Sequence, residues 1–148
     1  MKTEVYSIRC ISKEKCMLFI LTLLAFNLIF LKAYAQHKPW ITPQIAKNVK
    51  NPIAGSASGL SDGQTLYIVN CTPCHGNKGK GDGPASAALN PKPADHSSAL
   101  IQGETDGSLY WKLSEGRNPM PSYKKILTDK QRWELVNYIR TLSKTPKK

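Results

Sequence analysis

The chain has few of the residues that bind metals or form cross-links. Its 148 residues include four cysteines, three histidines and three methionines. No alternating run of β-branched residues surrounds Cys71 and Cys74, which argues against a thioredoxin-like redox pair, because that motif accompanies a βαβ pattern. A zinc site would need two more ligands, and the other histidines, His37 and His96, are not closely spaced. The chain also has no internal repeat, so we expect a single site.

The N-terminal hydrophobic run is too short to span a bilayer comfortably. It extends over 15 residues, from Met17 to Leu31, whereas a spanning helix needs about 20. A basic segment precedes it and Ala33-Tyr-Ala35 follows it, which predicts a secretory signal peptide at residues 1–35. An uncleaved membrane anchor remains the alternative. Cys10 and Cys16 precede the run, so we interpret them as incidental.

Cleavage after Ala35 would leave a mature chain beginning at Gln36, with Cys71 and Cys74 as its only cysteines. This chain of about 113 residues buries limited apolar surface by itself. It has 16 Lys plus Arg against 8 Asp plus Glu, a formal charge of +8. Such a charge favours an acidic protein partner or an anionic membrane surface. Nucleic acid is disfavoured, because the chain is predicted to be exported and its basic residues are scattered.

The segment Cys71-Thr-Pro-Cys74-His75 has the pattern of a c-type haem attachment site. Each thiol can add to one vinyl group of a haem, and His75 can then place a ring nitrogen on the iron. Its other ring nitrogen should donate to a carbonyl or carboxylate, for which the Pro84 carbonyl is a candidate. One motif predicts one covalent haem c. A large apolar cofactor would form much of the core, so we expect the haem-free chain to be poorly folded.

Met120 is the candidate for the second axial ligand. It is the only methionine after the predicted signal peptide, in the segment Asn118-Pro-Met-Pro-Ser122. The flanking prolines restrict the backbone. A thioether binds iron and gives a higher reduction potential than a second imidazole does. His96 is the alternative ligand.

Two domain boundaries follow from the distribution of proline, glycine and capping residues. Residues 36–60 contain three prolines and end in Gly55-Ser-Ala-Ser-Gly59, which predicts an extension and a flexible joint. Trp40 and Ile41 would dock this extension onto the domain, or it would act as a tether. The domain is predicted at residues 61–148. Its first helix would begin at a capping box formed by Ser61 and Gln64.

Two further helices are predicted in the domain. One runs from Asp106 to Glu115 and ends at Gly116. The other begins at a capping box of Thr128 and Gln131. Its apolar residues recur at helical spacing, which predicts that this face packs on the first helix near Gly63 and Tyr67. The residues of this face are Trp133, Leu135, Val136, Tyr138, Ile139 and Leu142.

Residues 61–142 resemble the bacterial class I c-type cytochromes. The matching features are a helix leading into CxxCH, the loop Gly81-Asp-Gly-Pro84, the Met120 segment and a C-terminal amphipathic helix. Gly63 and Tyr67 match family positions at which the terminal helices cross. The resemblance implies an all-α fold of three to five short helices wrapped around one covalent haem, and a function in electron transfer.

We therefore expect a non-enzymatic, single-haem carrier in a respiratory chain, without a small-molecule substrate. It would lie in the periplasm or at the outer face of the cytoplasmic membrane. Five lysines near the ligand segments are candidates for docking to redox partners: Lys78, Lys80, Lys112, Lys124 and Lys125. Two alternatives remain open. One is a fixed subunit of a respiratory complex, with residues 1–60 as anchor and docking arm; the other is a haem peroxidase or sensor in which Met120 leaves the iron.

Overall fold

The computed structural model describes residues 15, 17–19, 21, 22 and 39–143. The chain divides into two units, Met1–Trp40 and Ile41–Lys148, and the second contains the folded domain. Most of the predicted signal peptide lies outside the described residues, so its cleavage stays a prediction. Among the residues that are described, no helix is long and apolar enough to cross a membrane.

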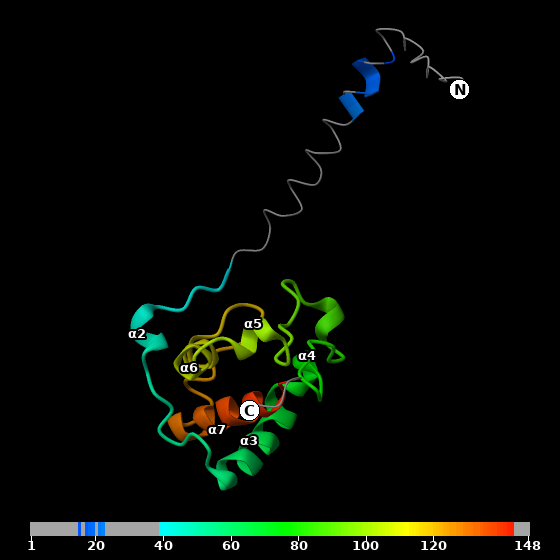
Figure 1. The fold of residues 1–148 in the computed structure, drawn as a ribbon. Helices are drawn as coiled ribbons and strands as arrows, with labels where there is room; N and C mark the ends of the chain where they lie inside the picture. Colours follow the sequence, from blue (N-terminus) through cyan, green and yellow to red (C-terminus); the bar gives the residue numbers. More distant parts are fainter. Residues whose placement is uncertain (1–14, 16, 20, 23–38, 144–148) are drawn as a thin grey trace, which may run out of the picture. The chain divides into compact units, whose positions relative to one another are not determined.

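The domain is mostly helical, as predicted, and the part of it that the structure describes contains no β-strand (Figure 1). An isolated antiparallel bridge joins Arg117 and Met120. The helices, in chain order, are α2 (Gln44–Lys47), α3 (Ala57–Asn70), α4 (Thr72–His75), the 3-10 helix η1 (Ser86–Ala88), α5 (Ala99–Gln102), α6 (Asp106–Glu115) and α7 (Asp129–Thr141).

Helices α3 and α7 pack closely at Gly63, as the spacing of apolar residues predicted. A Cβ atom on Gly63 would lie only 2.2 Å from the Glu134 carbonyl oxygen, so only glycine allows this approach. Tyr67 and Leu135 are fully buried at the contact. The rings of Tyr67 and Tyr138 lie 5.1 Å apart between their centroids. This crossing positions the end of α3, from which the cysteine motif begins.

The predicted bounds of α6 and the predicted start of α7 are confirmed. Helix α6 spans Asp106–Glu115 and is followed by Gly116 with φ of 66°. Thr128 and Gln131 form the predicted capping box of α7, in which each side chain receives a bond from the other residue's backbone amide.

The capping box predicted at Ser61 and Gln64 is wrong. Helix α3 begins at Ala57 with Ser56 as its N-cap, five residues before the predicted cap, and the Ser56 side chain accepts a hydrogen bond from the Gly59 amide. The reason is that Gly55, with a φ of 77°, ends the preceding turn, so that Ser56 can act as the N-cap directly after it. No proline occurs between Ala57 and Asn70 to interrupt the helix. Ser61 is an exposed residue inside the helix.

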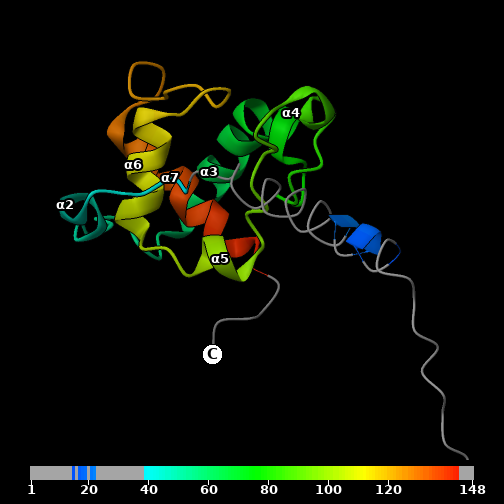
Figure 2. The ribbon, with the colours of Figure 1, turned by 90° about the horizontal axis from the view of Figure 1, so that it is seen from above.

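Residues 41–56, which we call the N-terminal arm, lie against α6 and α7; Figures 1 and 2 both show α2 beside α6. Thr42 and Ala46 are buried, whereas Ile41 is 74% exposed, so Ile41 is not a docking residue. Asn51 donates to the Asn137 side-chain oxygen over 2.7 Å, and Asn137 donates to the Ile53 carbonyl over 2.9 Å. This part of the predicted extension therefore packs on the domain as an ordered segment.

Candidate functional site

The two cysteines of the motif lie one helical turn apart, at the junction of α3 and α4. The Cys71 amide donates to the Tyr67 carbonyl over 2.9 Å, which continues α3 up to the motif. The amides of Cys74 and His75 both donate to the Cys71 carbonyl, over 3.1 and 2.8 Å. Residues three apart on a helical turn share a face, so both thiols are presented on one side. Both are free; Cys71 is buried and Cys74 is half-buried.

The glycine-rich loop after the motif folds back beneath α4. The amides of Gly81, Gly83 and Ala85 donate to the carbonyls of His75, Cys74 and Pro73, over 2.9, 3.1 and 2.9 Å respectively. These carbonyls would otherwise lack partners at the helix end. The loop thus fixes the backbone of the attachment turn.

His75 forms a hydrogen bond through one ring nitrogen, as predicted, but the accepting carbonyl is that of Ala94 and not that of Pro84. Nδ1 lies 3.0 Å from the Ala94 oxygen. The chain returns to this place because the His96 amide donates to the Gly79 carbonyl over 2.6 Å. Burial lowers the pKa of His75, against a smaller opposing effect of the bond to Ala94. The ring is therefore neutral at neutral pH, with Nδ1 as donor and Nε2 available as a ligand.

His96 lies directly against His75. The two rings stack with centroids 4.0 Å apart and planes inclined by 20°. Nδ1 of His96 also lies 3.0 Å from the Tyr67 hydroxyl oxygen. Burial lowers the pKa of His96 to about 3, and the neighbouring His75 acts in the same direction. The sequence suggested His96 only as an alternative iron ligand, and nothing in its spacing indicated contact with His75.

Met120 lies in a tight turn whose ends are bonded to each other. Arg117 and Met120 exchange backbone hydrogen bonds of 2.8 and 2.9 Å around a cis Asn118–Pro119 peptide. The Met120 side chain is partly buried and packs against the apolar cluster that also contains Cys71. That cluster further includes Leu109, Leu113, Tyr123 and Leu127.

Tyr123 connects the Met120 segment to the cysteine motif, and it was not singled out in the sequence. Its hydroxyl donates to the Asn70 carbonyl over 2.9 Å, and its amide donates to the Leu113 carbonyl over 3.0 Å. Burial raises the pKa of Tyr123 to about 12, with the nearby thiols of Cys71 and Cys74 acting in the same direction. The only available signal would have been an aromatic residue three positions after a candidate ligand.

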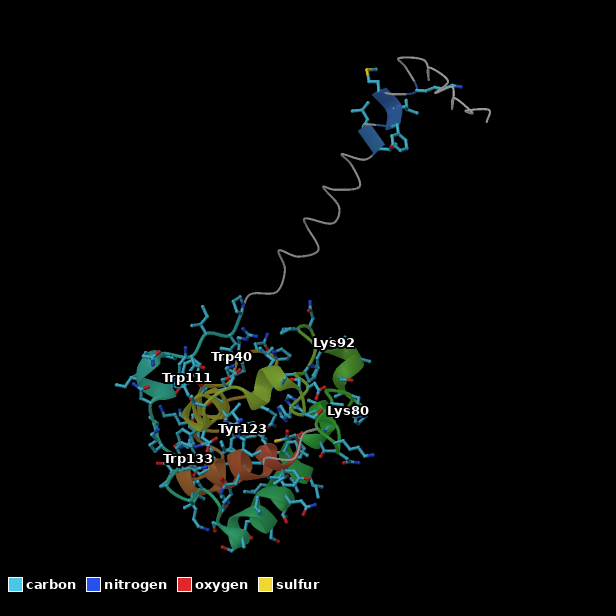
Figure 3. The ribbon with its side chains drawn as sticks, in the orientation of Figure 1. Trp40, Lys80, Lys92, Trp111, Tyr123 and Trp133 are labelled. Atoms are coloured by element: carbon cyan, nitrogen blue, oxygen red, sulfur yellow. The ribbon has the colours of Figure 1, made fainter. Side chains whose placement is uncertain are left out.

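The five candidate docking lysines differ in their surroundings. Lys78, Lys80 and Lys125 are exposed, and Lys124 lies 3.5 Å from Glu115. Lys112 does not belong to this group, because its side chain is only 13% exposed and pairs with Glu104. Figure 3 shows Lys80 and Lys92 at the end of the domain that carries α4, and Trp133 toward the opposite end.

These residues fit a haem attached through two thioether bonds. The attachment turn offers two free thiols on one face and an imidazole whose Nδ1 already donates to Ala94. The Met120 thioether lies on the segment that Tyr123 connects to Asn70, directly before the attachment turn. The apolar cluster contains Cys71 and packs against Met120. Together with the helical fold, this set of side chains defines a protein of the c-type cytochrome class.

The cytochrome c family model matches residues 60–143, and the chain belongs to this family. Its domain implies covalent haem c and electron transport, and family members are typically carriers rather than enzymes.

Two solved structures are similar to this chain. The KustC0563 c-type cytochrome is 27% identical, with a TM-score of 0.50; the match covers 56% of this chain and 99% of that one. A chain of the Kuenenia stuttgartiensis reducing HAO-like protein complex Kustc0457/Kustc0458 is 26% identical, with a TM-score of 0.55. That match covers 76% of this chain but only 55% of the other, so this chain spans about half of that relative.

Proposed function

We propose that the protein is an exported single-haem cytochrome that carries one electron at a time between protein partners. Cys71 and Cys74 would hold haem c covalently, and His75 and Met120 would be the axial ligands of the iron. The observation that carries this proposal is the connection of the two ligand segments: the Met120 segment is bonded through Tyr123 to Asn70, directly before Cys71.

The arrangement of His96 favours Met120 over His96 as the second ligand. The His96 ring is stacked on the His75 ring and bonded to Tyr67. The second axial ligand has to approach the iron from the side opposite His75. A ring that lies against His75 on the attachment side would need to leave both contacts to do so. Met120 lies in a separate segment and packs on the cluster that includes Cys71.

The side chains explain why such a site would transfer electrons and not bind substrates. The haem supplies a one-electron Fe(III)/Fe(II) couple. His75, oriented by Ala94, and Met120, held in its hydrogen-bonded turn, would occupy both axial positions and exclude water and small molecules. Cys71 and Cys74 would hold the cofactor through thioether bonds, so that little rearrangement would accompany a change of valence. Burial of neutral ligands favours the state with the lower net charge.

The partners would be redox proteins with acidic surfaces. The exposed Lys78, Lys80 and Lys125 occupy segments adjoining the ligands, and Figure 3 places Lys80 at the end that carries α4. Contacts between electron carriers are small and short-lived, because a carrier must release each partner. Charge attraction would mainly accelerate the encounter.

A fixed subunit of a larger redox complex is the second candidate. The observation that favours it is the similarity to a chain from a complex with an HAO-like protein. The N-terminal arm, packed on α6 and α7, would then be part of a docking surface. Purification of the native protein from its source, with native mass measurement, separates the two: a shuttle would migrate as a monomer, and a subunit would co-purify with a stoichiometric partner.

Substitution of Met120 tests the axial assignment. The wild-type ferric protein should show the weak red-end absorption band of a methionine–iron bond. Met120→His should abolish the band, keep a low-spin iron and lower the reduction potential, because imidazole stabilises Fe(III) more than a thioether does. Met120→Ala should bind cyanide rapidly. An unchanged band and potential in Met120→Ala would refute the assignment.

Tyr123→Phe is the matched control for this experiment. It removes the bond to Asn70 but leaves the Met120 thioether in place. The red-end band should therefore persist, and only the stability of the segment should fall. Loss of the band in both variants would indicate general disruption of the segment and not the loss of a ligand.

Covalent attachment is tested separately by mass and haem staining. The intact mass should correspond to one haem per chain, and acid acetone should not extract it. Cys71→Ala should leave at most one thioether and much less holoprotein. N-terminal sequencing of the native protein should begin at Gln36; an intact N-terminus in the membrane fraction would favour the anchor alternative.

A further inference from the structure

His96 occupies a defined place between three elements, although the proposed electron transfer requires no group there. Its amide donates to the Gly79 carbonyl and its carbonyl accepts from the Gln102 side chain over 2.7 Å. Its Nδ1 meets the Tyr67 hydroxyl. Both the backbone and the ring of His96 are thus fixed, and the ring has its face against His75.

The hydrogen bond to Ala94 alone leaves one rotation of the His75 ring unrestrained. A hydrogen bond from Nδ1 to a carbonyl limits the direction of the ring edge, but it tolerates rotation of the ring plane about that bond. A parallel ring at 4.0 Å removes this freedom, because rotation would bring the faces of the two rings into collision. His96 therefore restrains the plane of the His75 ring.

We propose that His96 is a positioning residue that sets the orientation of the His75 imidazole plane and thereby tunes the haem. This inference rests on the proposed role of His75 as an axial ligand. The orientation of an axial imidazole plane determines how its π orbitals overlap with those of ferric iron. It therefore governs the distribution of unpaired spin over the porphyrin and contributes to the reduction potential.

Tyr67 supports His96 from the other side. The Tyr67 ring is fully buried at the crossing of α3 and α7, and burial raises the pKa of its hydroxyl, which stays protonated. Its ring and that of His96 also meet at 67°, with centroids 5.8 Å apart. The packing of the terminal helices is thus connected through Tyr67 and His96 to the proposed iron ligand.

Three variants of the holoprotein separate stacking from hydrogen bonding. His96→Phe keeps an aromatic ring without the bond to Tyr67, His96→Gln keeps a polar group without a ring, and His96→Leu keeps only bulk. The readouts are the hyperfine-shifted haem methyl resonances in ferric NMR, which report the orientation of the axial ligand, and the reduction potential. Leu142→Ala is the control, because Leu142, the residue after α7, packs beside the same glycine, Gly79.

The proposal predicts a changed methyl pattern and a shifted potential in His96→Leu and His96→Gln, with values near wild type in His96→Phe and Leu142→Ala. If His96→Leu fails to fold, the comparison of His96→Phe with His96→Gln still tests the proposal. A wild-type pattern in His96→Gln, or an equal shift in Leu142→Ala, would overturn the proposal. A wild-type protein without the red-end band would refute Met120 as ligand; because His96 is the alternative ligand, loss of low-spin iron in His96→Phe would then show that His96 binds the iron and would overturn the positioning role.

Discussion

Helix α7 contacts α3 and the N-terminal arm through two surfaces of opposite character. Toward α3 it presents Tyr138, whose Cβ lies close to Gly63 and whose ring packs on Tyr67, and Leu135 is fully buried in the same apolar cluster as Tyr67. Toward the N-terminal arm it presents Asn137, which exchanges hydrogen bonds with Asn51 and Ile53. The first surface is stabilised by close apolar contact and the second by satisfied buried polar groups.

The polar surface extends beyond Asn137 to Arg140. Its guanidinium donates to the Asp106 carboxylate over 2.8 Å and to the Gln102 carbonyl over 3.0 Å, and Asn51 contacts the other Asp106 oxygen at 3.2 Å. The arm, α6 and α7 thus share one network. The comparison teaches that apolar contacts hold the two terminal helices together, whereas directional bonds determine where the arm lies.

The largest effect should come from Gly63→Ala at the apolar surface. The added Cβ would lie 2.2 Å from the Glu134 oxygen and 2.7 Å from its carbonyl carbon, so the backbones of α3 and α7 must separate. We expect a loss of about 3 kcal/mol in the free energy of unfolding, the upper part of the range for overpacking. Denaturant titration of the holoprotein measures it.

Gly59→Ala is the matched control in the same helix. Its Cβ would lie 3.4 Å or more from the nearest atoms, an ordinary contact distance. The free energy of unfolding should stay unchanged or rise by up to about 1 kcal/mol, because alanine favours helix more than glycine does. Equal losses in both variants would contradict the close approach at Gly63.

The polar surface should be less sensitive, and Asn137→Ala tests it. The substitution leaves the Ile53 carbonyl without its donor and the Asn51 amide without one of its acceptors. An unsatisfied buried polar group costs about 1–3 kcal/mol, and we expect about 2 kcal/mol. The exposed Asn48→Ala should cost well under that in the same denaturant titration. A loss in Asn137→Ala that matches Asn48→Ala would show that the arm network contributes little.

The difference between the surfaces also explains what could be predicted from the sequence. The apolar residues of α7 recur at helical spacing, and Gly63 and Tyr67 lie one turn apart on α3. The crossing of the two helices was therefore predictable from spacing alone. Asn51 and Asn137 lie 86 positions apart and belong to no motif. A hydrogen bond between two such amides leaves no periodic trace, and the arm was accordingly interpreted only as an extension that docks or a tether.

The candidate site divides in the same way. Cys71, Cys74 and His75 were predictable because short-range spacing encodes the attachment turn. The Ala94 acceptor, the stacking of His96 and the bond from Tyr123 to Asn70 arise from loops. Their paths depend on single backbone contacts between distant residues, such as the bond from His96 to Gly79, which no local pattern encodes.

A smaller effect is expected where the arm meets α6. A Cβ on Gly107 would lie 2.1 Å from the Ala46 oxygen and 2.7 Å from the Val49 oxygen, so Gly107→Ala should displace the arm. Because α2 packs on α6 at the surface of the domain, it can move away without opening the core, and we expect a loss of about 1 kcal/mol. Hydrogen exchange should accelerate at the amides of residues 46–49 and not in α7. Equal acceleration in α7 would contradict a separable arm.

The smallest effect should come from Ile45→Ser, which tests whether the arm docks through one side only. Ile45 is 81% exposed although it precedes Ala46, which is 8% exposed and faces α6. Since the isoleucine buries little apolar surface, its replacement should change the free energy of unfolding by no more than about 0.5 kcal/mol. Ala46→Asp, at the adjacent buried position, should cost several times more, because a charge would enter the contact without a partner. Equal effects of the two substitutions in thermal and denaturant unfolding would mean that the arm does not rest on α6 through Ala46 and that only its bonds to Asn137 hold it in place.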